Sequence, residues 1–162
     1  MKEIGGYLGF ETLIHHTFYE NAIALNLARN ALIYLAKAKH IEKVYLPYFL
    51  CDSISNVCDR NNIQYEFYHI DSHFHPVFEK HLSECEYLYI VNYYGQLDNT
   101  TIQSYKKLYQ NIIIDNVQAF FAAPVKNTDT LYSCRKFFGV PDGAYLISDA
   151  PMQTLCLDNS CE

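Results

Sequence analysis

The sequence predicts a layered α/β domain in which helices cover both faces of a mainly parallel sheet. Seven short apolar runs alternate along the chain with segments of helical period, which is the order typical of this class. The length of 162 residues suits one compact domain, and half of the residues are hydrophobic, including 15 tyrosines and 10 phenylalanines. These observations favour a three-layer α/β/α fold with a mainly parallel seven-stranded sheet, and they exclude collagen-like and disordered classes.

The seven apolar runs are the expected strands, and helices are expected between them. The runs cover residues 22–28, 43–49, 64–70, 87–95, 111–119, 130–133 and 144–148. Apolar periodicity predicts helices over residues 29–40 and 100–110. Another helix is expected over 52–62 with Asp52 as its N-cap, and a fourth from Pro76 to Glu84, because proline suits the first helical position. Residues 120–129 are expected to form a loop.

The charge balance and the cysteine spacing exclude several classes of protein. A net charge of -6 argues against binding to a nucleic-acid backbone, which needs clustered lysine and arginine. No apolar run approaches the roughly 18 residues of a membrane helix. The six cysteines form no C-x-x-C pair and no secretory signal precedes them, so we expect a reduced, cytoplasmic protein. His69, His73 and His75 lack a matching carboxylate or cysteine pattern, so no metal site is expected.

Polar residues that close the apolar runs are the candidate site residues, because ligands of open α/β sheets bind at the carboxyl ends of the strands. Asp115 follows three isoleucines; it either needs a cationic or hydrogen-bonding partner or caps the following turn. Lys136 stands beside Phe137 and Phe138, which we expect to desolvate its ammonium group and free the amine as a nucleophile toward a carbonyl. A solvated surface lysine is the alternative.

Two further positions are candidates for holding an anion. Ser133 lies shortly before Lys136 and could bind an anion on the same face. A helix is expected to begin at about Arg29, directly after the first strand, where free N–H groups and a guanidinium favour a phosphate. An ordinary strand-to-helix turn with a surface arginine is the alternative for this segment.

In their order along the chain, these pieces resemble the large domain of fold type I pyridoxal-phosphate-dependent enzymes, closest to the DegT/DnrJ/EryC1/StrS family of sugar aminotransferases. The resemblance runs from about Gly5 to Ser148 and rests on IGGYLGFE, NLARNAL, VYLPYF, VNYYGQ, IIDNVQA and SCRKFFGVPDGAYL. Its most specific feature is an Asp-x-x-Gln after a strand, followed by a Ser-x-x-Lys and a glycine-containing turn. The resemblance implies a cofactor-binding large domain over residues 1–150, with an N-terminal arm over 1–20 and an unassigned tail over 151–162.

The resemblance also implies a role for each matching residue. Lys136 would form the internal aldimine with pyridoxal 5'-phosphate and later shuttle a proton. Asp115 would pair with the pyridinium nitrogen, and Gln118 would contact the hydroxyl side of the ring. The phosphate would be held by Ala28, Arg29, Asn30 and Ser133, and the ring would stack on Phe49 or Tyr48.

Several positions depart from the family pattern. The usual small-residue phosphate turn is replaced by residues 27–30, the stacking aromatic falls near Cys51, and the histidine of the fourth strand is Asn92. Family enzymes are more than twice as long and carry a small C-terminal domain. We therefore expect a truncated product, a fragment or a stand-alone remnant.

The resemblance implies an aminotransferase that moves an amino group from a donor such as glutamate to a keto sugar attached to a nucleotide, in cell-surface polysaccharide biosynthesis. Family members are homodimers that share site residues. Retention of Lys136 argues against the dehydratase branch, in which the lysine is replaced. The alternatives are an inactive remnant that acts as a binding or interaction module, another fold type I enzyme such as a cysteine desulfurase-like protein, and a general nucleotide-binding module.

Overall fold

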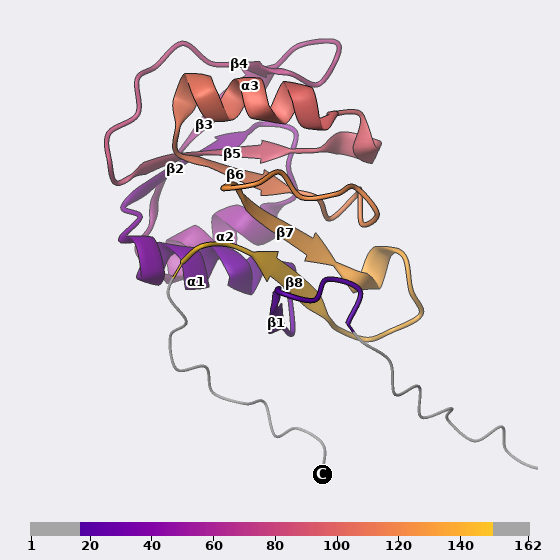
Figure 1. Ribbon diagram of the computed structural model, residues 1–162. Coiled ribbons are helices and arrows are strands. Elements are labelled where there is room, and N and C mark those ends of the chain that lie inside the picture. Colours follow the sequence, from indigo (N-terminus) through magenta and orange to yellow (C-terminus); the bar gives the residue numbers. More distant parts are fainter. Residues whose placement is uncertain (1–16, 151–162) are drawn as a thin grey trace, which may run out of the picture.

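An eight-stranded sheet forms the centre of residues 17–150, the part of the chain that the computed structural model describes (Figure 1). Its strands are β1 (Ile23–Leu25), β2 (Lys43–Pro47), β3 (Gln64–Ile70), β4 (Pro76–Val77), β5 (Glu86–Val91), β6 (Ile112–Asp115), β7 (Asp129–Ser133) and β8 (Ala144–Ile147). In space they lie in the order β1-β8-β7-β6-β5-β2-β3-β4. The expected tail over 151–162 and most of the expected N-terminal arm lie outside the described residues.

The strands from β7 through β6, β5 and β2 to β3 run parallel to one another. Strand β8 runs antiparallel between β7 and β1, and the two-residue β4 is antiparallel to β3 at the other edge. The expected α/β class and the mainly parallel sheet are therefore confirmed. The sheet has eight strands rather than seven because of β4.

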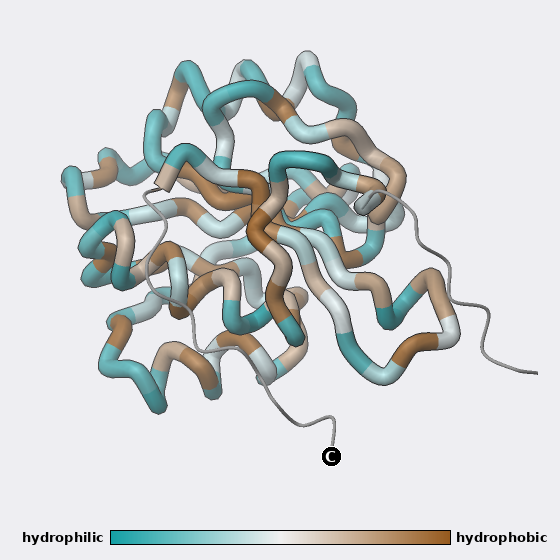
Figure 2. Tube along the Cα trace, turned by 60° about the horizontal axis from the view of Figure 1, so that its bottom comes forward, coloured by the Kyte–Doolittle hydropathy of each residue, from teal (hydrophilic) through white to brown (hydrophobic). Residues whose placement is uncertain are grey.

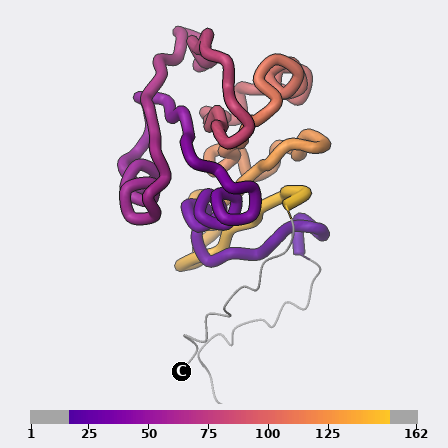
Figure 3. Tube along the Cα trace, turned by 90° about the vertical axis from the view of Figure 1, so that its left-hand side faces the viewer, coloured from indigo at the N-terminus to yellow at the C-terminus, as the bar shows by residue number. Residues whose placement is uncertain are grey.

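Between residues 17 and 150, three α-helices cover the sheet, as Figures 1 and 3 show. Helices α1 (Ala28–Lys39) and α2 (Asp52–Arg60) lie on one face and α3 (Asn99–Tyr109) lies on the other. This arrangement is the expected three-layer sandwich. The N-cap of α2 is Cys51 and not the expected Asp52, which is the first helical residue. None of these helices is both long and apolar enough to span a membrane.

The helix expected from Pro76 to Glu84 does not form. Pro76 and Val77 form β4, and residues 78–83 have no regular secondary structure. Proline is tolerated at a sheet edge because its missing N–H removes no ladder hydrogen bond there. The ring of Phe78 packs against Tyr45 at 4.8 Å between centroids, so a core contact holds this segment in place of helical hydrogen bonds.

Alternate residues of the central strands pack against opposite helical layers, as the two-residue period of a strand requires. Tyr89 of β5 and Ile113 of β6 belong to the core cluster beneath α1 and α2. Their neighbours Ile90, Ile112 and Ile114 belong to the cluster beneath α3. Hydrophobic segments accordingly run through the middle of the fold in Figure 2. Burial of both faces explains why these strands read as continuous apolar runs.

The strand order reverses between β2 and β5, and this reversal places the site. Strand β2 leads outward to β3, whereas β5 leads to β6 and β7 on the opposite side. Loops that leave the carboxyl ends at such a switch point diverge and leave a crevice for a ligand. The antiparallel β8 also makes β1 end at the same edge as β7. The segments after β1, β2, β5, β6 and β7 therefore meet at one edge.

Candidate active site

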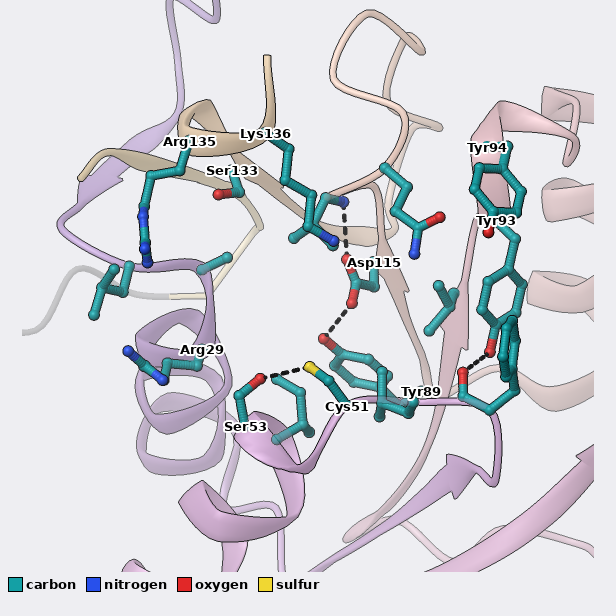
Figure 4. Close-up of a pocket in the computed structure, with 18 of the residues that line it drawn as sticks. Arg29, Cys51, Ser53, Tyr89, Tyr93, Tyr94, Asp115, Ser133, Arg135 and Lys136 are labelled. Atoms are coloured by element: carbon teal, nitrogen blue, oxygen red, sulfur yellow. Dashed lines mark hydrogen bonds between the residues drawn. The ribbon is translucent and has the colours of Figure 1, made fainter. Parts of the chain in front are cut away.

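A pocket of about 520 Å³ lies at this edge (Figure 4). Its volume is within the range of small-molecule and cofactor sites, roughly 300–1,000 Å³. Most of the residues expected to form the site line it: Ala28, Arg29, Tyr48, Phe49, Asp115, Gln118, Ser133 and Lys136. Asn30 does not line the pocket; its side-chain amide instead donates to Asn26 Oδ1 at 2.6 Å.

Asp115 ends β6 with its carboxylate almost completely buried, since the residue is only 2% exposed. Its Oδ1 accepts a hydrogen bond from the Val117 backbone N–H at 2.8 Å, and its Oδ2 accepts one from the Tyr89 hydroxyl at 2.8 Å. Burial raises the pKa of Asp115 above its ordinary value, against the opposing effects of these two bonds and of the positive charge of Lys136. Asp115 thus both caps the turn after β6 and faces the pocket.

Lys136 ends a short 3-10 turn, η2 (Cys134–Lys136), that follows β7. Figure 4 shows its side chain extending into the pocket toward Asp115. The expectation that Phe137 and Phe138 desolvate its ammonium group is wrong. Both rings contact Phe120, and Lys136 is exposed. Phe137 and Phe138 follow η2, and their rings pack against Phe120 and Phe121 instead of enclosing the Lys136 side chain.

One side of the pocket is cationic. Arg29 in the first turn of α1 and Arg135 in η2 lie on the same side of the pocket as Ser133 in Figure 4. Leu27, the N-cap of α1, provides no side-chain acceptor for the first N–H groups of the helix, and the first turn holds no acidic residue. Such a helix start with guanidinium groups beside it suits a phosphate or another anion.

The opposite side of the pocket is aromatic. Tyr48 and Phe49 follow β2, and Tyr93 and Tyr94 follow β5. The Tyr93 hydroxyl donates to the Phe49 carbonyl at 2.6 Å, which ties the two segments together. Cys51, where the resemblance places the stacking aromatic, precedes α2, and its Sγ atom lies 2.9 Å from Ser53 Oγ.

Gln118 lines the pocket and contains an unsatisfied group. Its Oε1 atom is buried and has no hydrogen-bond partner among the described residues. Buried polar atoms in native proteins are nearly always paired, so an unpaired one that lines a pocket indicates a place where a ligand supplies the partner.

Asn92, where the resemblance places a histidine, does not line the pocket and has a structural role. It is completely buried; its Oδ1 accepts from the Leu97 N–H at 2.9 Å, and its Nδ2 donates to Asn116 Oδ1 at 3.0 Å. Asn92 thereby fastens the loop after β5 to the loop after β6.

The histidines in and after β3 have local partners. The His69 ring lies 4.7 Å from the ring of Tyr48, and the backbone N–H groups of His73 and His75 both donate to Asp71 Oδ1. Within residues 17–150, no three His, Cys, Asp or Glu residues are grouped in a way that could hold a metal ion.

The sequence reasoning gave no role to Tyr89 or Arg135, which both line the pocket. Tyr89 lies inside an apolar run and reads as a core residue. Arg135 lies between Ser133 and Lys136, which were both expected to face the pocket. That position was the one signal in the sequence that Arg135 is close to the pocket as well.

No protein-family model matches the sequence, and no curated protein matches it. Solved structures do match its fold. One is S. venezuelae DesV in complex with a ketimine intermediate. The match covers 80% of this chain and 40% of the DesV chain, with 13% identity and a TM-score of 0.63. Another is NtdA from Bacillus subtilis with bound PMP, where the match covers 80% of this chain and 33% of the NtdA chain, with 16% identity and a TM-score of 0.64. A third is E. coli GDP-4-keto-6-deoxy-D-mannose-3-dehydratase with hydrated PLP, where the match covers 79% of this chain and 39% of the dehydratase chain, with 14% identity and a TM-score of 0.58.

These matches bear out the resemblance in fold to the large domain of fold type I pyridoxal-phosphate-dependent enzymes of the DegT/DnrJ/EryC1/StrS type. The chain spans less than half the length of each of the three proteins.

The raised pKa of Asp115 predicts a pH-dependent effect of Asp115→Asn. Because the folded protein holds this proton more tightly than the unfolded chain, the contribution of Asp115 to stability falls as the pH rises from about 4 through the folded-state pKa. The neutral amide avoids this loss and retains an acceptor for Val117. We expect the ligand-free variant to gain a few degrees in Tm at pH 8, as about 1 kcal/mol corresponds to about 2–4 °C in a domain of this size.

Thermal unfolding of the ligand-free protein between pH 4 and pH 8 measures this effect. The gain should shrink toward pH 4, and Asp142→Asn, which alters an exposed carboxylate, serves as the control. A Tm difference that stays constant with pH would contradict the account of Asp115.

Proposed function

We propose that the chain binds pyridoxal 5'-phosphate at Lys136 and acts as an enzyme of the aminotransferase type. The observation that carries the proposal is the convergence of Lys136 and the buried Asp115 on one pocket with a cationic side (Figure 4). Two neighbours of the same fold support it, because NtdA carries PMP and the E. coli dehydratase carries hydrated PLP.

The donor set of the pocket fits each part of this cofactor. Arg29, Arg135, Ser133 and the start of α1 offer donors for a phosphate, and Asp115 offers an anion for a protonated ring nitrogen. Gln118 has an unpaired buried oxygen for the polar edge of the ring. The lining aromatics Tyr48 and Phe49 supply the apolar surface that a planar ring needs.

Bound pyridoxal phosphate supplies an electron sink, which is what allows an amino group to pass between an amino acid and a carbonyl compound. The Lys136 amine is the nucleophile that holds the cofactor covalently and, once released, the base that moves a proton at the substrate carbon. The Asp115 carboxylate keeps the proton on the ring nitrogen through its opposite charge. Arg29 and Arg135 fix the orientation of the ring by anchoring the phosphate.

The proposed substrates are an amino donor such as glutamate and a keto sugar attached to a nucleotide, as in the synthesis of cell-surface polysaccharides. Tyr48, Phe49 and Tyr94 line the pocket with largely exposed rings, which offer an apolar face and, in the tyrosines, a polar edge. Sugar rings present the complementary mixture of C–H and hydroxyl groups. The name of the E. coli dehydratase also contains a keto sugar attached to GDP.

The proposed active form is a homodimer. Next to the turn that carries Lys136 lies a group of exposed rings in which Phe121 contacts each of the other three, and we call it the phenylalanine patch: Phe18, Phe121, Phe137 and Phe138. Phe121 is 62% exposed and Phe18 is 59% exposed. Exposed apolar patches of this kind mark interaction surfaces, and a second copy of the chain is the proposed occupant.

The cofactor proposal predicts a covalent adduct at one lysine. After incubation with pyridoxal phosphate and reduction with borohydride, peptide mass mapping should find the pyridoxyl group on Lys136. The adduct and its visible absorbance should be absent in Lys136→Ala and unchanged in Lys126→Ala, which removes an exposed loop lysine. A wild type with no adduct, or an adduct that persists in Lys136→Ala, would contradict the proposal and favour an inactive binding module.

The proposed phosphate site predicts that Arg135→Gln weakens the binding of pyridoxal phosphate but not the binding of pyridoxal. We expect the affinity for pyridoxal phosphate to fall at least about tenfold, because one charge-assisted hydrogen bond contributes roughly 1.5–3 kcal/mol. The affinity for pyridoxal, which lacks the phosphate, should stay the same. Equal losses for both ligands in equilibrium titrations would show that Arg135 does not contact the phosphate.

The phenylalanine patch predicts a concentration-dependent dimer that polar substitutions dissociate. Sedimentation velocity of Phe121→Ser/Phe137→Ser should give a monomer, because the substitutions remove apolar area from the contact. The control Leu108→Ser changes an exposed leucine on α3 and should leave the dimer intact. A wild-type protein that sediments as a monomer at high concentration would overturn this assembly.

A further inference from the structure

Tyr89 contacts the Asp115 carboxylate from inside the core. Its Cα is paired with Ile113, two residues before Asp115, and the side chains of Ile113 and Asp115 share one face of the sheet. The Tyr89 side chain lies on that same face and extends toward the carboxyl end of the strands. There its hydroxyl donates to Asp115 Oδ2 at 2.8 Å, and both residues line the pocket (Figure 4).

The two groups depend on each other. A completely buried tyrosine hydroxyl needs a hydrogen-bond partner, and Asp115 Oδ2 is the acceptor that the structure supplies. A buried carboxylate needs donors, and Tyr89 and the Val117 N–H supply one for each oxygen. Burial and the negative charge of Asp115 raise the pKa of Tyr89 well above its ordinary value, so the phenol stays protonated and acts as a donor.

The direction of this bond determines which form of Asp115 it favours. A hydrogen bond donated to a carboxylate stabilises the charged form, and bonds to charged groups are stronger than those between neutral groups. The contact also holds the carboxyl group in one orientation, since Oδ1 is fixed by Val117 and Oδ2 by Tyr89. The lone pairs that remain on the carboxylate can then accept from a ligand in the pocket.

We infer that Tyr89 is a positioning residue that orients the Asp115 carboxylate and keeps it charged, so that Asp115 can pair with the protonated ring nitrogen of the cofactor. The inference rests on the proposed function, and it adds a residue that acts through Asp115. A tyrosine that merely filled the core would affect folding but would not distinguish between ligands with and without a ring nitrogen.

The test is a comparison of two ligands on Tyr89→Phe. Equilibrium titration of the full chain with pyridoxal phosphate should show about tenfold weaker binding in the variant, which corresponds to about 1.4 kcal/mol. The deaza analogue, which has carbon in place of the ring nitrogen, cannot pair with Asp115. Its affinity should be the same for the variant and the wild type.

Tyr132→Phe is the matched control, because Tyr132 is also completely buried but donates its hydroxyl to the Ala122 carbonyl at 2.9 Å and does not line the pocket. It should leave both affinities unchanged. Thermal unfolding establishes that each variant is folded. Tyr89→Leu, which also lacks the hydroxyl, must show the same selective loss.

Three results would overturn the inference. Equal losses for both ligands in Tyr89→Phe would reduce Tyr89 to a packing residue, and an unchanged affinity for pyridoxal phosphate would remove its role altogether. In both of these cases the wild type still binds the cofactor and the proposed function survives. A wild type that binds neither ligand would instead end the proposed function and the inference together.

Discussion

The burial of the Asp115 carboxylate at the end of β6 is the constraint on which the rest of the site depends. A charge held in the core is unfavourable unless donors and a cation compensate for the lost water. Here the compensation comes from the Val117 N–H, the Tyr89 hydroxyl and the positive charge of Lys136. Because burial still raises the pKa of Asp115, the compensation is incomplete. Under the proposed function, a ligand with a protonated ring nitrogen would complete it.

The sheet topology places this charge in a pocket with two distinct sides. The reversal of strand order between β2 and β5 opens the crevice, and the parallel strands bring their polar ends to one edge. Arg29 and Arg135 occupy one side, while Tyr93 and Tyr94 occupy the other (Figure 4). Under the proposed function, a planar ligand with an anionic end would have one favourable orientation between them, with its reactive group toward Lys136.

Much of the fold could be predicted from the sequence, because buried parallel strands and amphipathic helices leave strong periodic signals. The strand-end position of Asp115 was equally visible. Side-chain direction within short irregular segments was not, and this explains the errors at Phe137 and at Pro76, where tertiary contacts override local preference. Tyr89 could not be identified for another reason. A tyrosine within an apolar run is interpreted as a core residue, and the sequence does not show which group its hydroxyl contacts.

The central claim is that Asp115 pairs with a protonated ring nitrogen of pyridoxal phosphate. The most direct measurement is the nitrogen-15 NMR chemical shift of the ring atom when labelled cofactor is bound to the wild-type chain. The account predicts the shift of a protonated pyridinium at neutral pH, and its loss in Asp115→Asn. A bound cofactor with the shift of a neutral pyridine in the wild type would contradict the account.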